Sequence, residues 1–167
     1  ILLAGALDKK VTWAQAGMIW LFSYIGNFAG SFLVGGFFVL TGIKGQPVAE
    51  FIVKVAGTKM NGPFLDLFVK GMLCNILVCL AVLCALKLKS ESGKLIMVFW
   101  CLFAFITSGF EHSVANMTIF TMGLLLPHGE TVSLAGMVAN LLPVTLGNFV
   151  GGGVLLGGAY YFLGKDK

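Results

Sequence analysis

Four long apolar stretches dominate the chain and predict four membrane-spanning helices, named here spans A to D. They cover residues 13–40, 64–86, 95–126 and 132–163. Each is long enough to cross a bilayer as a helix, which takes about 20 residues. Between spans A and B, the outer connecting segment 42–62 is polar at both ends, and its middle alternates apolar and charged residues at helical spacing. Residues 47–59 are therefore expected to form a short amphipathic helix outside the membrane or at its edge.

The composition favours a membrane protein over a soluble one. Hydrophobic residues make up 58% of the 167 residues and charged residues only 11%, whereas a soluble domain carries about 25% charged residues. The mean hydropathy is +0.97. The 23 glycines agree with this, because small residues let membrane helices approach closely. The sequence thus predicts a single all-α integral membrane domain over residues 1–167.

The net charge of +4 comes from lysine, and its placement predicts topology rather than nucleic-acid binding. Lysines at the chain start, between spans B and C and after span D are Lys9, Lys10, Lys87, Lys89, Lys94, Lys165 and Lys167. Cytoplasmic loops are enriched in lysine. These segments, including the C-terminus, are therefore expected on the cytoplasmic side of the cell membrane. The outer connecting segment is the exception, because it holds Lys44, Lys54 and Lys59. A longer segment obeys the charge rule weakly and leaves room for a lysine kept outside for a functional reason.

An internal repeat relates spans A and D. Gly26-Asn27-Phe28-Ala29-Gly30 in span A matches Gly147-Asn148-Phe149-Val150-Gly151 in span D. Both copies have the small-residue spacing of close helix packing, which predicts packing roles for Gly26, Asn27, Gly30, Gly147, Asn148 and Gly151. Spans A and D enter the membrane from opposite sides, so the repeats are inverted, as in many transport folds. Counterparts of spans B and C are then expected upstream, which predicts six spans and a chain that lacks the first two.

Span C is interrupted by a polar run, residues 108–116, that contains Glu111 and His112. In a continuous helix these ionisable groups would lie near the bilayer centre, where they are costly and usually face a cavity or pore. A helix that breaks at Ser108-Gly109 and resumes near Asn116 explains the run better. The loop backbone then lines a cavity, and the N-terminus of the second half-helix offers free N–H groups to an anion. The pattern predicts a pathway for a small anion.

The polar residues of this run have different expected roles. His112 is the pathway candidate, because imidazole exchanges a proton near neutral pH, and a structural histidine bonded to the loop is the alternative. A carboxylate on an anion path would repel its cargo, so Glu111 is expected to point away and brace the loop. Asn116 either donates its amide to the cargo or caps the second half-helix. His128, beside Glu130 in a polar loop, is interpreted as a solvated residue.

Neither a metal site nor a cofactor nor an active site is predicted. Four cysteines lie within apolar spans and are interpreted as small hydrophobic residues: Cys74, Cys79, Cys84 and Cys101. They lack the close paired spacing of a zinc site. Glu111, His112 and Ser113 are adjacent and point in different directions, which makes them a poor catalytic triad. The chain is therefore not expected to be an enzyme.

Three segments resemble the formate/nitrite transporter family. Ser108-Gly-Phe-Glu-His-Ser-Val-Ala-Asn-Met117 resembles the signature of that family, Gly71-Met-Leu-Cys-Asn-Ile-Leu-Val-Cys-Leu-Ala-Val82 its fourth helix, and Leu142-Pro-Val-Thr-Leu-Gly-Asn-Phe-Val-Gly-Gly-Gly153 its sixth. The resemblance covers essentially the whole chain, in order. It implies six helices in an aquaporin-like inverted repeat, of which the third to sixth are present here. It also implies homopentamers with one pore per protomer, and small monovalent anions as substrates: formate, nitrite, hydrosulfide and, in some members, lactate.

The resemblance also implies roles for individual residues. The central pore histidine of the family falls on His112, and a constriction phenylalanine seven residues earlier falls on Phe105. The vestibule lysine falls on Lys59, while Glu111 and Asn116 match the residues beside the histidine. The second helix of the family is also broken and supplies further constriction residues, which are absent here apart from a tail at residues 1–7. The chain is therefore expected to hold about half a pore.

These residues suggest a mechanism in which a proton helps the anion across. A bare anion in hydrocarbon meets a Born cost of order 20 kcal/mol, which a single lysine at the mouth cannot remove. Lys59 is expected to attract the anion, which then passes an apolar collar including Phe105. His112 donates a proton to it, directly or through water, or only hydrogen-bonds it. Two alternatives stay open: a neutral or ammonia-type solute channel with a histidine proton relay, and a non-conducting structural or receptor protein.

Overall fold

The computed structural model describes residues 2–165, and the regular elements in this range are all helices. Ile1, Asp166 and Lys167 lie outside the described residues, and so does the expectation that Lys167 is cytoplasmic. The elements in chain order are α1 (Leu2–Leu7), α2 (Trp13–Leu40), α3 (Pro47–Met60), α4 (Phe64–Lys87), α5 (Glu91–Thr107), α6 (Ser113–Leu125), α7 (Leu134–Asn148), the π-helix η1 (Phe149–Gly157) and α8 (Gly158–Lys165).

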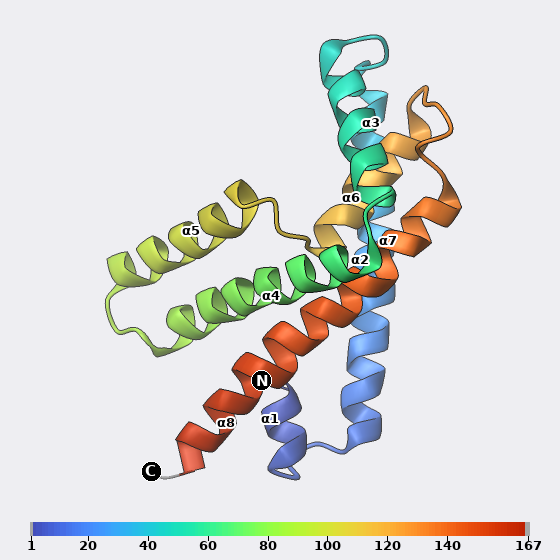
Figure 1. Ribbon diagram of the computed structural model, residues 1–167. Helices are drawn as coiled ribbons and strands as arrows, with labels where there is room; N and C mark the ends of the chain where they lie inside the picture. Colours follow the sequence, from blue (N-terminus) through green and yellow to red (C-terminus); the bar gives the residue numbers. More distant parts are fainter. Residues whose placement is uncertain (1, 166–167) are drawn as a thin grey trace.

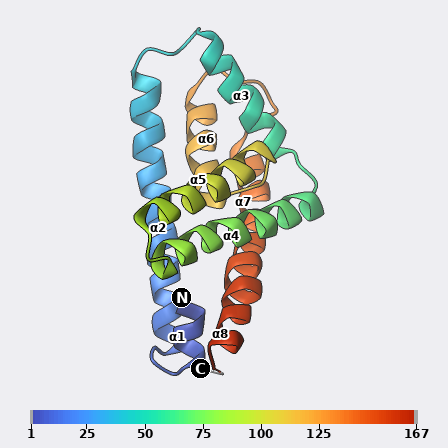
Figure 2. The same cartoon turned by 90° about the vertical axis from the view of Figure 1, so that its left-hand side faces the viewer.

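Two long helical rods cross the molecule, and a hairpin projects from them. Figure 1 shows that α2 and the rod formed by α7, η1 and α8 run in opposite directions. Helices α4 and α5 form the hairpin, and in Figure 2 it crosses in front of the two rods. Helices α3 and α6 lie at one end of the molecule, whereas α1 and α8 lie at the other.

Local sequence explains where several helices begin. Thr12 caps α2 in a capping box: its hydroxyl accepts from Gln15 N at 3.2 Å, and its own N–H donates to Gln15 Oε1 at 2.9 Å. Ser90 and Ser133 cap α5 and α7 with a single bond, because each hydroxyl accepts the N–H of a glycine three residues ahead. Pro47 occupies the first turn of α3, where its missing N–H costs nothing.

The helix bounds follow the apolar pattern of the sequence. Helices α2, α4 and the continuous segment Leu134–Gly164 are long and apolar enough to cross a membrane. Helix α3 covers the expected amphipathic segment. The third expected span is two helices, α5 and α6, separated by residues 108–112. The break was expected to extend to about Asn116, but α6 begins three residues earlier, because the chain already finds a cap at His112.

The largest buried cluster joins α3, α6 and α7. It consists of Ala56, Met60, Met117, Phe120, Val132, Met137 and Leu141, and Tyr24 of α2 packs against it. Many large apolar side chains of α2 and α5 are instead exposed, among them Phe22, Phe37, Phe99 and Ile106. Such surfaces suit contact with lipid or with other helices, because a bilayer accepts apolar groups that water does not.

The two copies of the glycine motif differ in their packing. Gly147 and Gly151 press against the backbone of α4, where an added Cβ would collide with the carbonyl groups of Phe68 and Met72. At Gly26 and Gly30 an added Cβ would meet no atom within 4 Å, and Asn27 between them is exposed. In the α7–η1 rod, Gly147 and Gly151 thus let the rod approach α4 closely. For the copy in α2, the described residues provide no helix to pack against.

Candidate functional site

The candidate pathway lies at the break between α5 and α6. Gly109 has a φ of 67°, a left-handed conformation that strains residues with a Cβ, so glycine lets the chain turn here. The N–H of Glu111 donates to the carbonyl of Lys70 at 3.4 Å, which attaches the break to α4. Ser108 ends α5 as its C-cap. The break is thus an ordered turn rather than a loose loop.

His112 forms the N-cap of α6. Its Nδ1 accepts the N–H of Ala115 at 3.3 Å, and the ring of Phe105 stacks on the imidazole with centroids 6.1 Å apart. A neutral imidazole that accepts through Nδ1 carries its proton on Nε2. The cap therefore fixes which nitrogen donates, and it leaves the Nε2–H as the free donor of the ring.

A buried ion pair stands directly beside this cap. Lys59 Nζ lies 2.7 Å from Glu111 Oε1, and Asn116 Nδ2 donates to Glu111 Oε2 at 2.5 Å. Asn116 also donates to Asn140 Oδ1 at 2.9 Å, and Asn140 donates to the Lys59 carbonyl at 2.8 Å. Both carboxylate oxygens of Glu111 are therefore paired, and one network joins α3, the break, α6 and α7.

Asn148 of the repeat motif clamps the break from the other side. Its Nδ2 donates to the carbonyls of Gly71 at 2.8 Å and Glu111 at 2.9 Å, and its Oδ1 accepts the N–H of Ser113 at 3.0 Å. Its own carbonyl accepts from Asn75 Nδ2 at 2.6 Å. One side chain thus satisfies backbone groups on both sides of His112 and on α4, which holds the histidine in place.

The structure adds contacts to the expected roles. His112, not Asn116, caps α6, and the Asn116 amide, expected either to cap this helix or to donate to the cargo, donates to Glu111 and Asn140. Lys59, expected to attract the anion, is paired with Glu111. Asn75 and Asn140 were not anticipated as site residues. The sequence signal for both was present, because an uncharged amide inside an apolar span needs a hydrogen-bond partner.

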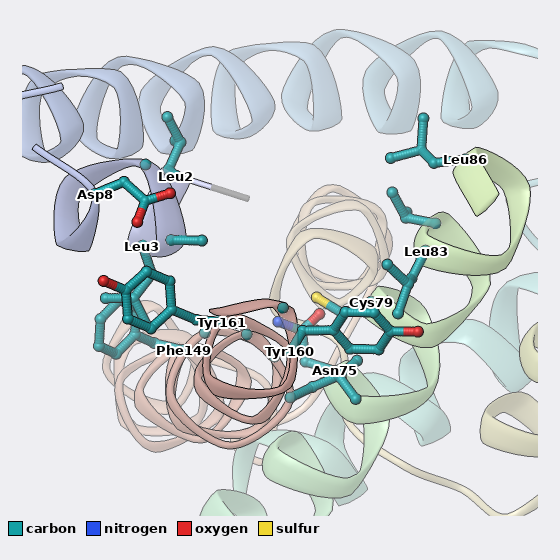
Figure 3. A pocket seen from close by; sticks show the side chains of 18 of the residues that line it. Leu2, Leu3, Asp8, Asn75, Cys79, Leu83, Leu86, Phe149, Tyr160 and Tyr161 are labelled. Carbon is teal, nitrogen blue, oxygen red and sulfur yellow. The ribbon is translucent and has the colours of Figure 1, made fainter. Parts of the chain in front are cut away.

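A cavity of about 910 Å³ lies on the far side of the Asn148 clamp. Figure 3 shows that Asn75, Cys79, Phe149, Tyr160 and Leu3 border it. Its walls are mostly apolar and come from α1, α2, α4, η1 and α8. Because Asn75 contacts both this cavity and Asn148, the cavity adjoins the network that supports the break.

The cysteines and His128 lie outside the network around the break. Within residues 2–165, no group of three His, Cys, Asp or Glu side chains is arranged to hold a metal ion. Cys74, Cys79, Cys84 and Cys101 are free thiols, of which Cys74 and Cys101 are buried. His128 is exposed and contacts the carbonyl of Gly129 in the loop between α6 and α7.

Comparisons with known proteins agree with this architecture. The formate/nitrite transporter family model matches residues 1–162. The chain is 45% identical over 163 residues to the uncharacterized transporter YwcJ of Bacillus subtilis, covering 97% of this chain and 64% of that protein. It is 43% identical over 160 residues to the nitrite transporter NirC of Escherichia coli, covering 95% and 58%. The chain thus spans less than two thirds of the length of these two relatives.

Solved structures with the same arrangement are also similar. An FNT family ion channel superposes with a TM-score of 0.89 at 36% identity, covering 98% of this chain and 68% of that one. A pentameric formate channel with formate bound superposes with a TM-score of 0.86 at 28% identity, covering 100% and 75%. The similarity extends over the whole described fold, including the broken helix.

Proposed function

The chain belongs to the formate/nitrite transporter family, and from this premise we propose that it carries small monovalent weak-acid anions across a membrane. Members of this family are transporters and channels rather than enzymes. The observation that carries the proposal is the break between α5 and α6, where a histidine cap stands beside a buried ion pair. A packed structural helix needs neither, and both are costly inside a bilayer.

Lys59 attracts the anion to the break. Its side chain is 19% exposed, whereas that of Glu111 is 6% exposed, so the cation is the accessible partner of the pair. An arriving anion competes with Glu111 for the ammonium group. This competition keeps binding weak enough for the anion to leave again, as conduction requires.

Phe105 and His112 form the next step of the path. The phenyl ring of Phe105 excludes water beside the imidazole, and the Nε2–H of His112 offers a hydrogen bond to the anion. In surroundings of low dielectric constant, such a donor is stronger than in water. The pair therefore favours an anion small enough to touch the imidazole while the phenyl ring excludes its hydration shell.

The cap on α6 favours a neutral His112 in the resting protein. The Ala115 N–H can donate only to an unprotonated Nδ1, and the N-terminal end of a helix disfavours a nearby cation. If His112 delivers a proton, its Nε2–H passes to the anion while Nδ1 takes up a proton from water and gives up the bond from the Ala115 N–H. The ring returns to its resting form when Nδ1 loses that proton to water and Nε2 regains one. The neutral acid then crosses the apolar segment without the Born cost of a bare anion.

An ammonia-type channel with a histidine relay is the alternative. The same Nε2–H and apolar ring would suit a neutral solute, because neither adds a charge to the path. Lys59 weighs against it, since a cation at the mouth repels ammonium while attracting anions. The anion pathway and the ammonia-type channel therefore differ in which ion gathers at the break: an anion in the first and ammonium in the second.

Uptake by proteoliposomes tests the proposal. We expect the purified protein to take up formate, nitrite, hydrosulfide or lactate, and not methylammonium, and we expect His112→Phe to lower the anion flux. Uptake of methylammonium without anion uptake would support the alternative. An anion flux that stays constant between about pH 5 and 8, with no loss in His112→Phe, would rule out proton delivery by the histidine. A protein that moves no solute would support a structural or receptor role.

We further propose a homopentamer in the cell membrane with the C-terminus in the cytoplasm. The related pentameric formate channel and the exposed apolar faces of α2 and α5 support the assembly. Lysines near the α1–α2 turn and in the α4–α5 loop support the orientation. The partners are then the lipid bilayer, the transported anion and protons.

A further inference from the structure

One hydrogen bond joins two residues that are equivalent in the internal repeat. The hydroxyl of Tyr24 in α2 lies 3.1 Å from the hydroxyl of Thr145 in α7. These residues are 121 positions apart, and the motif copies that begin at Gly26 and Gly147 are offset by the same number of positions. Tyr24 and Thr145 therefore occupy the same place in their respective repeats.

A contact between equivalent residues locates the symmetry axis. A two-fold rotation carries each residue onto its equivalent, so two equivalent residues touch only where the axis passes between them. Helix α2 and the α7 rod run in opposite directions (Figure 1), as a two-fold axis in the membrane plane requires. The pseudo-two-fold axis therefore passes between the Tyr24 and Thr145 side chains, which places both near the middle of the bilayer.

The pair lies one helical turn from both motif asparagines. Asn148 follows Thr145 by three residues, and Asn27 follows Tyr24 by three residues, which puts each asparagine on the same face as its axial neighbour. Asn148 holds the backbone on both sides of His112. A shift of α7 along α2 would therefore move the clamp that presents the histidine.

Few other contacts fix α7 against α2. Helix α2 packs its backbone mainly on α6 rather than on α7. The ring contact of Trp20 with Phe149, at 5.2 Å between centroids, reaches η1 instead. Tyr24 itself is held by the cluster containing Met117 and Phe120, so its hydroxyl is a fixed point to which Thr145 can bond.

We propose that Tyr24 and Thr145 are positioning residues that lock the two repeats together at their axis. The pair sets the place of Asn148 and, through it, of His112. This inference rests on the proposed anion transport, and it adds two residues that touch neither the anion nor the histidine. Without the lock, Asn148 and the backbone that it holds beside His112 are free to shift, so the preference for the smaller anion should weaken.

Hydroxyl deletions test the lock in proteoliposomes. We expect Tyr24→Phe and Thr145→Val each to lower the ratio of formate uptake to lactate uptake at least threefold. The double variant should be no worse than either single variant, because both remove the same bond. Thr145→Ser should restore the ratio. Ser31→Ala is the matched control, since it removes a hydroxyl of α2 that bonds to another helix, at the carbonyl of Val114 in α6, away from the axis.

An exchange of the two residues tests the axial placement. Tyr24→Thr combined with Thr145→Tyr keeps both hydroxyl groups at the axis. Because the neighbours of the two positions differ, the exchange should recover part, not all, of the uptake ratio and of the thermal unfolding midpoint that Tyr24→Thr loses. Tyr24→Thr alone should lower both. An exchange variant as impaired as the double deletion would overturn the axial placement.

The outcomes separate the inference from the function on which it rests. If the unchanged protein takes up anions and the hydroxyl deletions leave the ratio unaltered, or act additively, the positioning role is wrong while anion transport stands. If the unchanged protein takes up no anion, the proposed function fails and the positioning role fails with it. The unfolding midpoint of the exchange variant then still decides the axial placement.

Discussion

At the scale of single residues, the Lys59–Glu111 pair keeps a charged lysine at the break without leaving an unpaired charge in the protein. An isolated charge inside a bilayer is costly, and a pair with satisfied hydrogen bonds reduces that cost. Asn116 and Asn140 supply the remaining bonds, one to the carboxylate and one to the Lys59 carbonyl. The lysine can therefore stay charged at the break while its partner holds the loop.

Removing the lysine should destabilise the protein more than its exposure suggests. Lys59→Met leaves Glu111 buried and unpaired, which we expect to cost about 3–5 kcal/mol and to lower the thermal unfolding midpoint measured by tryptophan fluorescence in detergent. Lys54→Met, at an exposed position of the same helix, is the control and should change stability by less than about 0.5 kcal/mol. Adding Glu111→Gln to Lys59→Met should recover part of the loss. Equal midpoints for Lys59→Met and Lys54→Met would contradict a structural role for the pair.

The two roles of His112 can be separated by substitution. Asparagine is a good N-cap, so His112→Asn should keep the bond to the Ala115 N–H and most of the stability, while the loss of the imidazole lowers anion flux. His112→Phe removes the cap as well and should cost a further 1 kcal/mol or so. Flux and unfolding midpoint measured on the same preparations check this. A His112→Asn variant with full flux would show that the imidazole is not needed.

At the scale of elements, the apolar pattern predicts most of the helices but not the contacts between them. The length of an apolar stretch and the polar residues that interrupt it are local properties. The helices and the existence of the break therefore follow from the sequence. The end of the break was misplaced because Asn116 and His112 both have the chemistry of a cap, and tertiary contacts decide between them. Asn148 was predicted only as a packing residue. Its bonds to Glu111 and Ser113 join residues 37 and 35 positions apart, and no local sequence pattern reveals contacts at such separations.

Close approach of η1 to α4 should make one glycine indispensable and its neighbour replaceable. A Cβ at Gly151 would collide with the Met72 carbonyl, whereas a Cβ at Gly153 would make an ordinary contact with the Phe149 ring at 3.7 Å. We expect Gly151→Ala to prevent the rod from packing on α4 and to abolish recovery of folded protein by gel filtration. Gly153→Ala should fold as well as the unchanged protein, because alanine has the higher helix propensity. Equal yields of both variants would contradict the observed packing.

At the scale of the whole molecule, the inferred pseudo-two-fold axis divides the proposed path into two halves, one for each side of the membrane. The break contacts α3 through the Lys59–Glu111 pair, and the cavity beside Asn75 is lined by α1 (Figure 3). Asn148 stands between them. The exposed Gly26-Asn27-Gly30 face of α2 is the symmetric counterpart of the packed Gly147-Asn148-Gly151 face. An exposed amide at this depth suits a polar partner from another segment or subunit.

The charge distribution then predicts which end faces the cytoplasm. Lys9 and Lys10 precede α2, and Lys87 and Lys89 lie at the α4–α5 loop, so these turns should remain inside. In intact cells, a membrane-impermeant maleimide should label Lys54→Cys in α3 and leave Lys89→Cys unlabelled until the membrane is permeabilised. The unsubstituted protein, with its four native cysteines, gives the background. Labelling of Lys89→Cys alone in intact cells would invert the topology, and Lys59 would then collect anions from the cytoplasm rather than from outside.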